Sequence, residues 1–179
     1  TGVMVVAKRD TAQWKIAKQF ELRQVRKSYL AIVHGTPELT ADRISARLGV
    51  HPLIREKYAV RPETGKDAVT FYEVIEAFRG FSLVQCKPRT GRTHQLRVHL
   101  SYLKHSIVAD DMYGGKLVYP WQLADEEPQA QNPVIARCAL HAWTLEFTHP
   151  TTEQRVEFKA PIPEDMQTFL DLLRQYRAQ

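Results

Sequence analysis

The chain has 179 residues, a length that fits one globular domain. Its formal net charge is +5 and its pI is about 9.3, a balance that favours a polyanionic partner without requiring one. Hydrophobic residues make up 44% of the chain, enough for a packed core, but no apolar run approaches the roughly 18 residues of a membrane span. We therefore expect no membrane-spanning helix in this sequence.

The chain begins inside an apolar, β-branched run, residues 1–7 (TGVMVVA), without an initiator methionine, a charged leader or a cleavage site. We expect residues 3–7 to form a buried strand in the middle of a longer protein, so the absence of a targeting signal carries no information. The two cysteines, Cys86 and Cys138, are far apart and fit no metal-ligand spacing. They are typical of reduced thiols, and we expect a cytoplasmic protein.

A first helix is predicted to begin at Asp10 or Thr11, either of which can cap it, and to end near Gln24. Residues 27–33 (KSYLAIV) are β-rich and apolar on both faces, which predicts a central strand. Residues 38–68 mix both charges with proline and glycine, and they predict short strands and loops. The buried face of the first helix is expected to carry Ile16, Ala17 and Phe20.

Residues 69–78 and 81–87 predict two strands that the Arg79-Gly80 pair joins as a hairpin. A turn at residues 88–91 follows, and residues 93–103 then predict a second helix. Its apolar side chains at helical spacing are Leu96, Leu100 and Leu103.

Residues 116–133 contain an acidic stretch and predict a surface insertion. Residues 138–147 and 154–159 predict two more strands, and a last helix opens at Pro163 and Glu164. This order of elements predicts an α+β fold with a central mixed, mainly antiparallel sheet flanked by helices and loops. The last helix is expected to turn Met166, Phe169, Leu170, Leu173 and Tyr176 inward.

The strongest candidate for chemistry is the basic segment at residues 87–97 (KPRTGRTHQLR), on a strand–turn–helix junction. Free N–H groups at a helix start favour phosphate, and arginine can grip an oxyanion with two parallel hydrogen bonds. These features indicate an anion site, and a solvated basic turn is the alternative. Arg92 and Arg97 lie five residues apart and point in different directions on a helix, so Arg92, at the helix start, is the better candidate.

Tyr29 lies inside the predicted central strand. It is either an ordinary core or sheet-surface residue, or a flat ring on which a base can stack, with a hydroxyl beside it. The histidines form no H-E-x-x-H or Cys/His pattern, and the chain has no P-loop, no G-x-G-x-x-G and no G-x-S-x-G. We therefore expect neither a metal nor a cofactor.

Residues 91–100 (GRTHQLRVHL) resemble the signature turn and helix of the RluA-type family of RNA pseudouridine synthases. Residues 27–35 (KSYLAIVHG) resemble the K-x-Y-x-A-x-V-x-G strand of that family, and residues 109–114 (ADDMYG) its G-D-x-x-Y-G segment, with alanine in place of the first glycine. Residues 140–150 resemble its L-H-A…F-x-H-P segment. Each match alone is modest, but they occur in order along almost the whole chain.

In this family the catalytic aspartate lies in an H-R-L-D-x-x-T-S/T-G motif, whose last two positions align with Thr1 and Gly2. The resemblance therefore implies a nucleophile just upstream of Thr1, and a pseudouridine synthase catalytic domain over residues 1–179 that is incomplete at its N-terminus. The chain as given is expected to be inactive alone. None of Asp10, Asp42, Asp67, Asp110 or Asp111 lies in that motif, so none of them is assigned the role.

The resemblance implies isomerisation of specific uridines to pseudouridine in structured ribosomal or transfer RNA by a monomeric enzyme without cofactor or metal. Tyr29 would stack on the uracil and help to remove the C5 proton, and Arg92 would pair with the aspartate. Lys87, Arg89 and Arg97 would serve the RNA backbone or the helix packing. Asp110 would hold its loop, through one of the arginines, and a structural hydrogen bond is expected for His94.

Two other classes of protein compete with this hypothesis. One is a non-catalytic RNA-binding protein on the same fold. The other is a basic α+β domain that binds an acidic protein or a nucleotide, which the ordered set of matches argues against.

Overall fold

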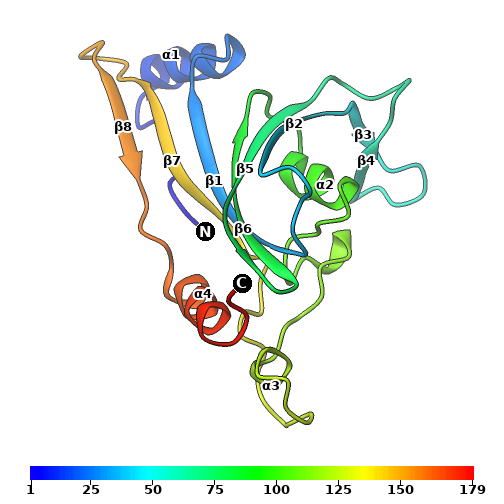
Figure 1. Cartoon of the computed structure of the whole chain (residues 1–179). Coiled ribbons are helices and arrows are strands. Elements are labelled where there is room, and N and C mark those ends of the chain that lie inside the picture. The colour runs from blue at the N-terminus through cyan, green and yellow to red at the C-terminus, as the bar shows by residue number, and fades with distance from the viewer.

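The computed structural model describes all 179 residues and contains one twisted six-stranded sheet (Figure 1). All neighbouring strands in it pair antiparallel, and the only parallel element is an isolated bridge between Gly2 and Ala142. The predicted α+β class with a mainly antiparallel sheet is confirmed. In spatial order the strands are β2 (Ala41–Ser45), β5 (Val69–Phe78), β6 (Phe81–Pro88), β1 (Arg26–His34), β7 (Leu140–Thr148) and β8 (Arg155–Lys159).

The remaining elements lie around this sheet. A short hairpin of β3 (Leu48–Val50) and β4 (Tyr58–Val60) stands apart at one side (Figure 1). No helix combines the length and the apolar character needed to cross a bilayer. The helices are α1 (Asp10–Glu21), α2 (Gln95–Tyr102), α3 (Pro120–Leu123) and α4 (Glu164–Tyr176), with a single 3-10 turn, η1 (Asp111–Tyr113).

Strand β1 lies between β6 and β7, which confirms the predicted central strand. Its residues from Leu30 to Val33 are all buried, because the sheet is covered on both faces at this level. The β5–β6 hairpin is also confirmed, and Gly80 occupies the left-handed region (φ +83°) at its tip. Glycine adopts that conformation without strain.

Strand register separates the two faces of the sheet. Tyr29 is paired with Cys86 and Ala142, and Cys86 with Tyr72, so these side chains lie on one face, here called the Tyr29 face. Helix α2 covers it, since Gln95 and His99 both hydrogen-bond to the Thr70 hydroxyl.

The opposite side of the sheet, here called the reverse face, carries the alternate positions. Leu30 pairs with Gln85 and Gln85 with Glu73 on this face. Helix α4 packs against one end of it, where the rings of Phe81 and Phe169 lie 5.8 Å apart. Because two residues back or forward on a strand return to the same face, the reverse face also carries Phe71 and Lys87, which pair with each other.

Residues 3–7 do not form the predicted buried strand. Ala142 exchanges hydrogen bonds with Thr1 and Val3, but β8 already occupies the edge of β7 from Thr144 to Thr148, so no further ladder can form. The side chains then alternate in burial. Val3, Val5 and Ala7 pack inward against Leu145 and Phe147, while Met4 and Val6 are 80% and 72% exposed.

Helix α1 is shorter than predicted and turns a different face to the sheet. It ends at Glu21, its N-cap is Arg9, and no side chain caps it. The Gln19 amide hydrogen-bonds to both the N–H and the C=O of Thr148, which fixes the rotation of the helix. Ile16 and Gln19 are therefore buried, whereas Ala17 and Phe20, predicted inward, are exposed.

Two further expectations need correction. Helix α2 begins at Gln95, since His94 adopts a left-handed conformation (φ +54°) that ends the preceding turn; Leu103 forms its half-buried C-cap. Tyr176 in the last turn of α4 is 36% exposed, because the core ends at Leu173. Within residues 116–133, Val118 and Leu123 are buried, and residues 125–132 are exposed.

A buried histidine makes the stability of this fold depend on pH. His99 is fully buried between the Thr70 hydroxyl and the carbonyl of Ala46, and burial lowers its pKa below the ordinary 6.5. A lowered pKa means that the unfolded state binds the proton more readily. The contribution of His99 to the free energy of unfolding should therefore be fully present well above pH 6.5 and fall as the pH drops below it.

We expect His99→Gln in the full-length protein to be less stable than wild type at pH 7.5, but to lose less stability between pH 7.5 and 5.5. Urea unfolding at both pH values measures this difference. Equal losses for the two proteins would show that His99 does not contribute to the pH dependence.

Candidate active site

The turn that leads into α2 is held by a single buried amide. Gln95 accepts hydrogen bonds from the Thr90 hydroxyl (2.7 Å) and from the backbone N–H of Arg92 (3.0 Å). Its NH2 group donates to the carbonyl of Val69 and to the hydroxyl of Thr70, both at 3.0 Å. All of its donors and both lone pairs of its oxygen are used, so Gln95 fixes the backbone of the turn at Arg92.

Arg92 itself is half-buried at the mouth of α2. Its Nε donates to the carbonyl of Asp67 at 3.0 Å, which orients the guanidinium. The two terminal nitrogens make no hydrogen bond or ion pair within the chain. A rigid fork with two free donors is suited to a carboxylate or a phosphate.

Tyr29 is half-buried on β1, and its hydroxyl has no hydrogen-bond partner within the chain. Burial raises the pKa of Tyr29, so its ring carries a neutral phenol at physiological pH. A half-exposed aromatic ring with a free hydroxyl can stack on a flat ligand and donate one hydrogen bond to it.

Lys27 connects the strand of Tyr29 with the turn of Arg92. Its Nζ lies 3.6 Å from the position that a Cβ would occupy on Gly91, and 5.6 Å from the centroid of the Phe20 ring on α1. Burial lowers the pKa of Lys27. The strand and the turn are therefore neighbours at the same end of the sheet. We predict that Tyr29 and Arg92 open onto one cleft.

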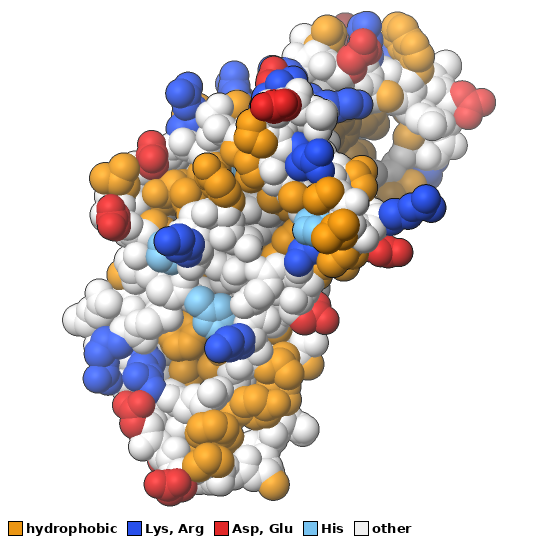
Figure 2. Space-filling model, turned by 90° about the vertical axis from the view of Figure 1, so that its right-hand side faces the viewer, with side chains coloured by type: hydrophobic (Ala, Val, Ile, Leu, Met, Phe, Trp, Pro, Cys, Tyr) orange, Lys and Arg blue, Asp and Glu red, His pale blue; other side chains and the backbone are white.

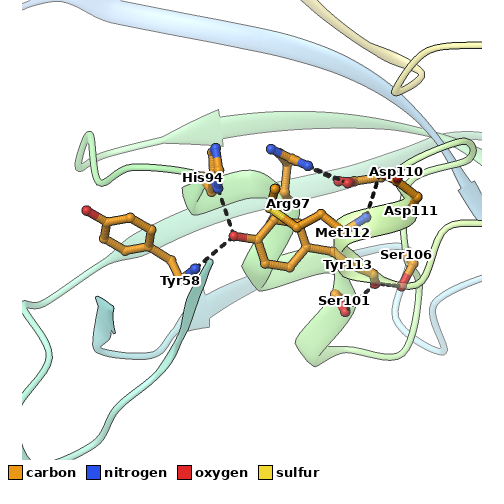
Figure 3. A network of polar contacts seen from close by, with 9 residues as sticks. All are labelled: Tyr58, His94, Arg97, Ser101, Ser106, Asp110, Asp111, Met112 and Tyr113. Atoms are coloured by element: carbon orange, nitrogen blue, oxygen red, sulfur yellow. Dashed lines mark hydrogen bonds and ion pairs between the residues drawn. The ribbon is translucent and has the colours of Figure 1, made fainter. Parts of the chain in front are cut away.

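Arg97 forms an ion pair with Asp110 (Figure 3). Nε and Nη2 of Arg97 donate to the two carboxylate oxygens at 2.7 and 2.6 Å, and the Asp110 side chain is fully buried. The hydrogen bonds to Asp110 raise the pKa of Arg97. The guanidinium also stacks 4.7 Å from the centroid of the Tyr113 ring. The expectation that Asp110 holds its loop through an arginine is confirmed.

Tyr113 joins three segments through one hydroxyl (Figure 3). The oxygen accepts a hydrogen bond from the N–H of Tyr58 at 2.9 Å and lies 2.8 Å from Nδ1 of His94. Burial, and then the charge of Arg97, lower the pKa of His94, so a neutral imidazole shares a hydrogen bond with the Tyr113 hydroxyl. The structural hydrogen bond expected for His94 is therefore present. It ties the turn to β4 and to the loop that ends at Gly114.

The other two basic candidates lie elsewhere. Lys87 is on the reverse face, 3.6 Å from Glu73 in an exposed pair, and the exposed side chain of Arg89 has no partner within the chain. Both line a groove of about 1200 Å³ that includes neither Tyr29 nor Arg92. On the side of the molecule that carries α2, β3 and β4, Lys and Arg side chains are spread among hydrophobic and acidic ones (Figure 2). The basic residues of the motif thus lie in three environments: Arg92 at the mouth of α2, Arg97 in an ion pair with a buried carboxylate, and Lys87 and Arg89 in the groove.

The sequence interpretation assigned no role to Gln95 or Tyr113, although both lie inside the recognised segments. A glutamine and a tyrosine are usually partly exposed, and no local pattern predicts that these two will be buried with their polar groups hydrogen-bonded. His, Cys, Asp and Glu side chains form no group of three that could hold a metal ion.

Comparisons with known proteins point to one family. The family model described as RNA pseudouridylate synthase matches residues 1–102. An uncharacterized RNA pseudouridine synthase of Chlorobaculum parvum is 42% identical over 179 residues, which cover 97% of this chain and 55% of the relative. Ribosomal large subunit pseudouridine synthase D of Xanthomonas campestris is 42% identical over 175 residues, covering 98% and 52%. The chain spans about half the length of these curated relatives.

A solved structure, human RNA pseudouridylate synthase domain containing 4, superimposes with a TM-score of 0.77 at 28% identity and covers 96% of this chain and 70% of that chain. The chain belongs to the RNA pseudouridylate synthase family, and its relatives place it with the RluA-type members that its motifs resemble.

Substitutions in the Arg97–Asp110 pair test whether this ion pair holds the loop that carries Asp110. Arg97→Met leaves a buried carboxylate without its partner, and we expect it to lower the free energy of unfolding by about 3 kcal/mol. Adding Asp110→Asn removes that charge, so the double variant should recover at least about half of the loss. Urea unfolding of the full-length protein measures both. A loss below about 1 kcal/mol for Arg97→Met would contradict this role.

Proposed function

We propose that the protein containing this chain isomerises specific uridines to pseudouridine in structured RNA. The observation that carries the proposal is the free guanidinium fork of Arg92, held at the start of α2 by Gln95 and Asp67 inside a family-specific segment. Relatives named for the large ribosomal subunit favour ribosomal RNA, and transfer RNA is the second choice. We expect a monomer that acts in the cytoplasm without metal or cofactor.

The nucleophile in this proposal is an aspartate in the family motif immediately before Thr1. Gly2 bridges to Ala142, and Ala142 pairs with Tyr29, so residues that precede Thr1 would emerge two strands from Tyr29, roughly 10 Å away. The guanidinium of Arg92 would keep the carboxylate ionised by favouring its charged form. Residues 1–179 alone should then make no pseudouridine and serve as a control without nucleophile.

In the reaction, the N1–C1′ bond of the uridine breaks, the uracil turns, and C5 bonds to C1′. C5 loses its proton, and N1 gains one. A uridine inside folded RNA has to be flipped out of its stack to reach the site. Tyr29 would stack on the uracil. Because burial keeps its phenol neutral, a relay through the hydroxyl fits removal of the C5 proton better than attack by a phenolate.

The basic residues divide between chemistry and binding in this proposal. Lys87 and Arg89 are exposed and would contact the RNA backbone. Arg97 is engaged by Asp110 and Tyr113, so its role would be to pack α2 against the loop that follows it.

Arg92→Lys in the full-length protein tests the assignment of chemistry. Lysine keeps the charge but loses the planar fork, so turnover of bound RNA should fall by about 100-fold or more. RNA affinity should change little, because many cations share the binding of the backbone. Release of tritium from RNA labelled at uridine C5, under single turnover with saturating enzyme, measures the chemical step.

Lys87→Ala is the matched comparison. It should weaken RNA binding and make its salt dependence shallower, with a near-normal single-turnover rate at saturation. If Arg92→Lys only weakens binding and reacts normally at saturation, then Arg92 is a phosphate clamp and its assignment to the active centre is wrong.

A further inference from the structure

We propose that the groove on the reverse face of the sheet binds a single-stranded RNA segment that flanks the target uridine, as a second contact away from the active site. This inference rests on the proposed function, because the RNA would be the same substrate molecule. The groove has a volume of about 1200 Å³ and lies over β5, β6, β1, β7 and β8.

Register places the groove opposite Tyr29. Ser28 pairs with Thr144, and Thr144 with Lys159, and all three line the groove. Phe71 and Lys87 pair with each other on the same face. Tyr29 and its paired neighbours point to the other side of the sheet. A ligand in the groove would therefore leave the Tyr29 face free for the target nucleotide.

The charge of the groove suits a polyanion. Seven of its eighteen lining residues are Lys or Arg, and two are Glu. Glu146 is already neutralised by Arg155 at 2.7 Å and by Arg26 at 3.5 Å. Lys159 and Arg89 are exposed and have no carboxylate partner in the chain. Such an excess of free cations in a concave surface favours a phosphate backbone.

Two aromatic side chains distinguish unpaired bases from a duplex or a simple anion. Trp143 is half-buried in the groove, with Nζ of Lys159 4.5 Å from the centroid of its ring. Phe71 is 42% exposed, although an apolar ring on a strand is normally covered. A basic groove with aromatic platforms is the arrangement that binds single strands, since every base can stack on such a ring.

The groove reaches the end of the sheet where the active-site turn begins. Lys27 and Arg89 are among its lining residues, and Arg92 follows Arg89 by three residues, at most about 10 Å along the chain. Lys27 also approaches Gly91 in the same turn. An RNA strand leaving the groove would pass around this end of the sheet, by Arg89 and then Lys27, to reach Arg92.

Binding of a labelled oligouridylate of about 12 nucleotides to the full-length protein tests the groove directly. Lys159→Glu should weaken binding about tenfold at low salt and reduce the slope of log affinity against log salt by about 1. The matched control is Lys104→Glu, an exposed lysine outside the groove and without an ion pair, which should bind nearly as wild type. Trp143→Leu should weaken binding about fivefold or more, and Trp143→Phe, which keeps a ring, should retain it.

Wild-type binding by Lys159→Glu and Trp143→Leu would overturn the proposal. So would equal competition by a polyglutamate peptide of matched charge, which would identify a site for acidic protein. Protection of Lys159 and Lys87 from amine-reactive labelling in the RNA-free full-length protein would also overturn it, because the upstream part of the chain would then fill the groove. Pseudouridine formation is scored separately in the same preparations. If the protein is active but the groove variants bind oligouridylate normally, only the groove proposal is wrong. If binding depends on the groove but no pseudouridine forms, the proposed function is wrong.

Discussion

The bidentate ion pair between Arg97 and Asp110 is the constraint on which the candidate active site depends. A fully buried carboxylate is tolerated only with a well-aligned partner, so α2 and the loop that carries Asp110 cannot separate without exposing or orphaning that charge. The pair sets the guanidinium against Tyr113, and the Tyr113 hydroxyl in turn holds His94. His94 is the last residue of the turn that presents Arg92, so the ion pair positions the turn through a chain of contacts.

Gln95 completes this arrangement from the other side. It bonds the backbone of Arg92 and links it to β5 through Val69 and Thr70. Arg92 thereby rests on a scaffold whose polar groups are satisfied, while its own terminal nitrogens are free. A pre-organised cation of this kind is what stabilisation of a reacting carboxylate or phosphate requires.

Local patterns predicted most of the fold, and tertiary contacts account for the rest. The apolar run around Leu30 and the Arg79-Gly80 turn are strong local signals, and both elements formed where they were expected. The rotation of α1 depends on Gln19 bonding to Thr148, 129 residues away, which no local periodicity contains. Residues 3–7 have strand composition, but the edge they needed belongs to β8.

The candidate site, like the fold, could be predicted from the sequence only in part. The motif singled out Arg92 and Tyr29 as candidates, and their catalytic roles stay predictions. Arg92 and Arg97 do bond to different partners, but Arg92 lies before the start of α2, so helical spacing is not the reason. Helical spacing could not show that Arg97 would form an ion pair with Asp110. It also could not show that Gln95 would hold the turn by hydrogen bonds. The groove on the reverse face could not be predicted from the sequence. Lys159, Trp143 and Lys87 are far apart along the chain, and only the pairing of β6, β1, β7 and β8 brings them together.

Formation of pseudouridine in cellular RNA is the activity that we propose for the full-length protein. Mass-spectrometric mapping of pseudouridine in ribosomal and transfer RNA from cells that carry the gene, and from cells that lack it, tests this claim most directly. We expect one or a few uridines, foremost in the large-subunit ribosomal RNA, to be left unmodified when the gene is absent and to be modified again when the wild-type gene is restored. An identical pseudouridine map in both kinds of cell would contradict it.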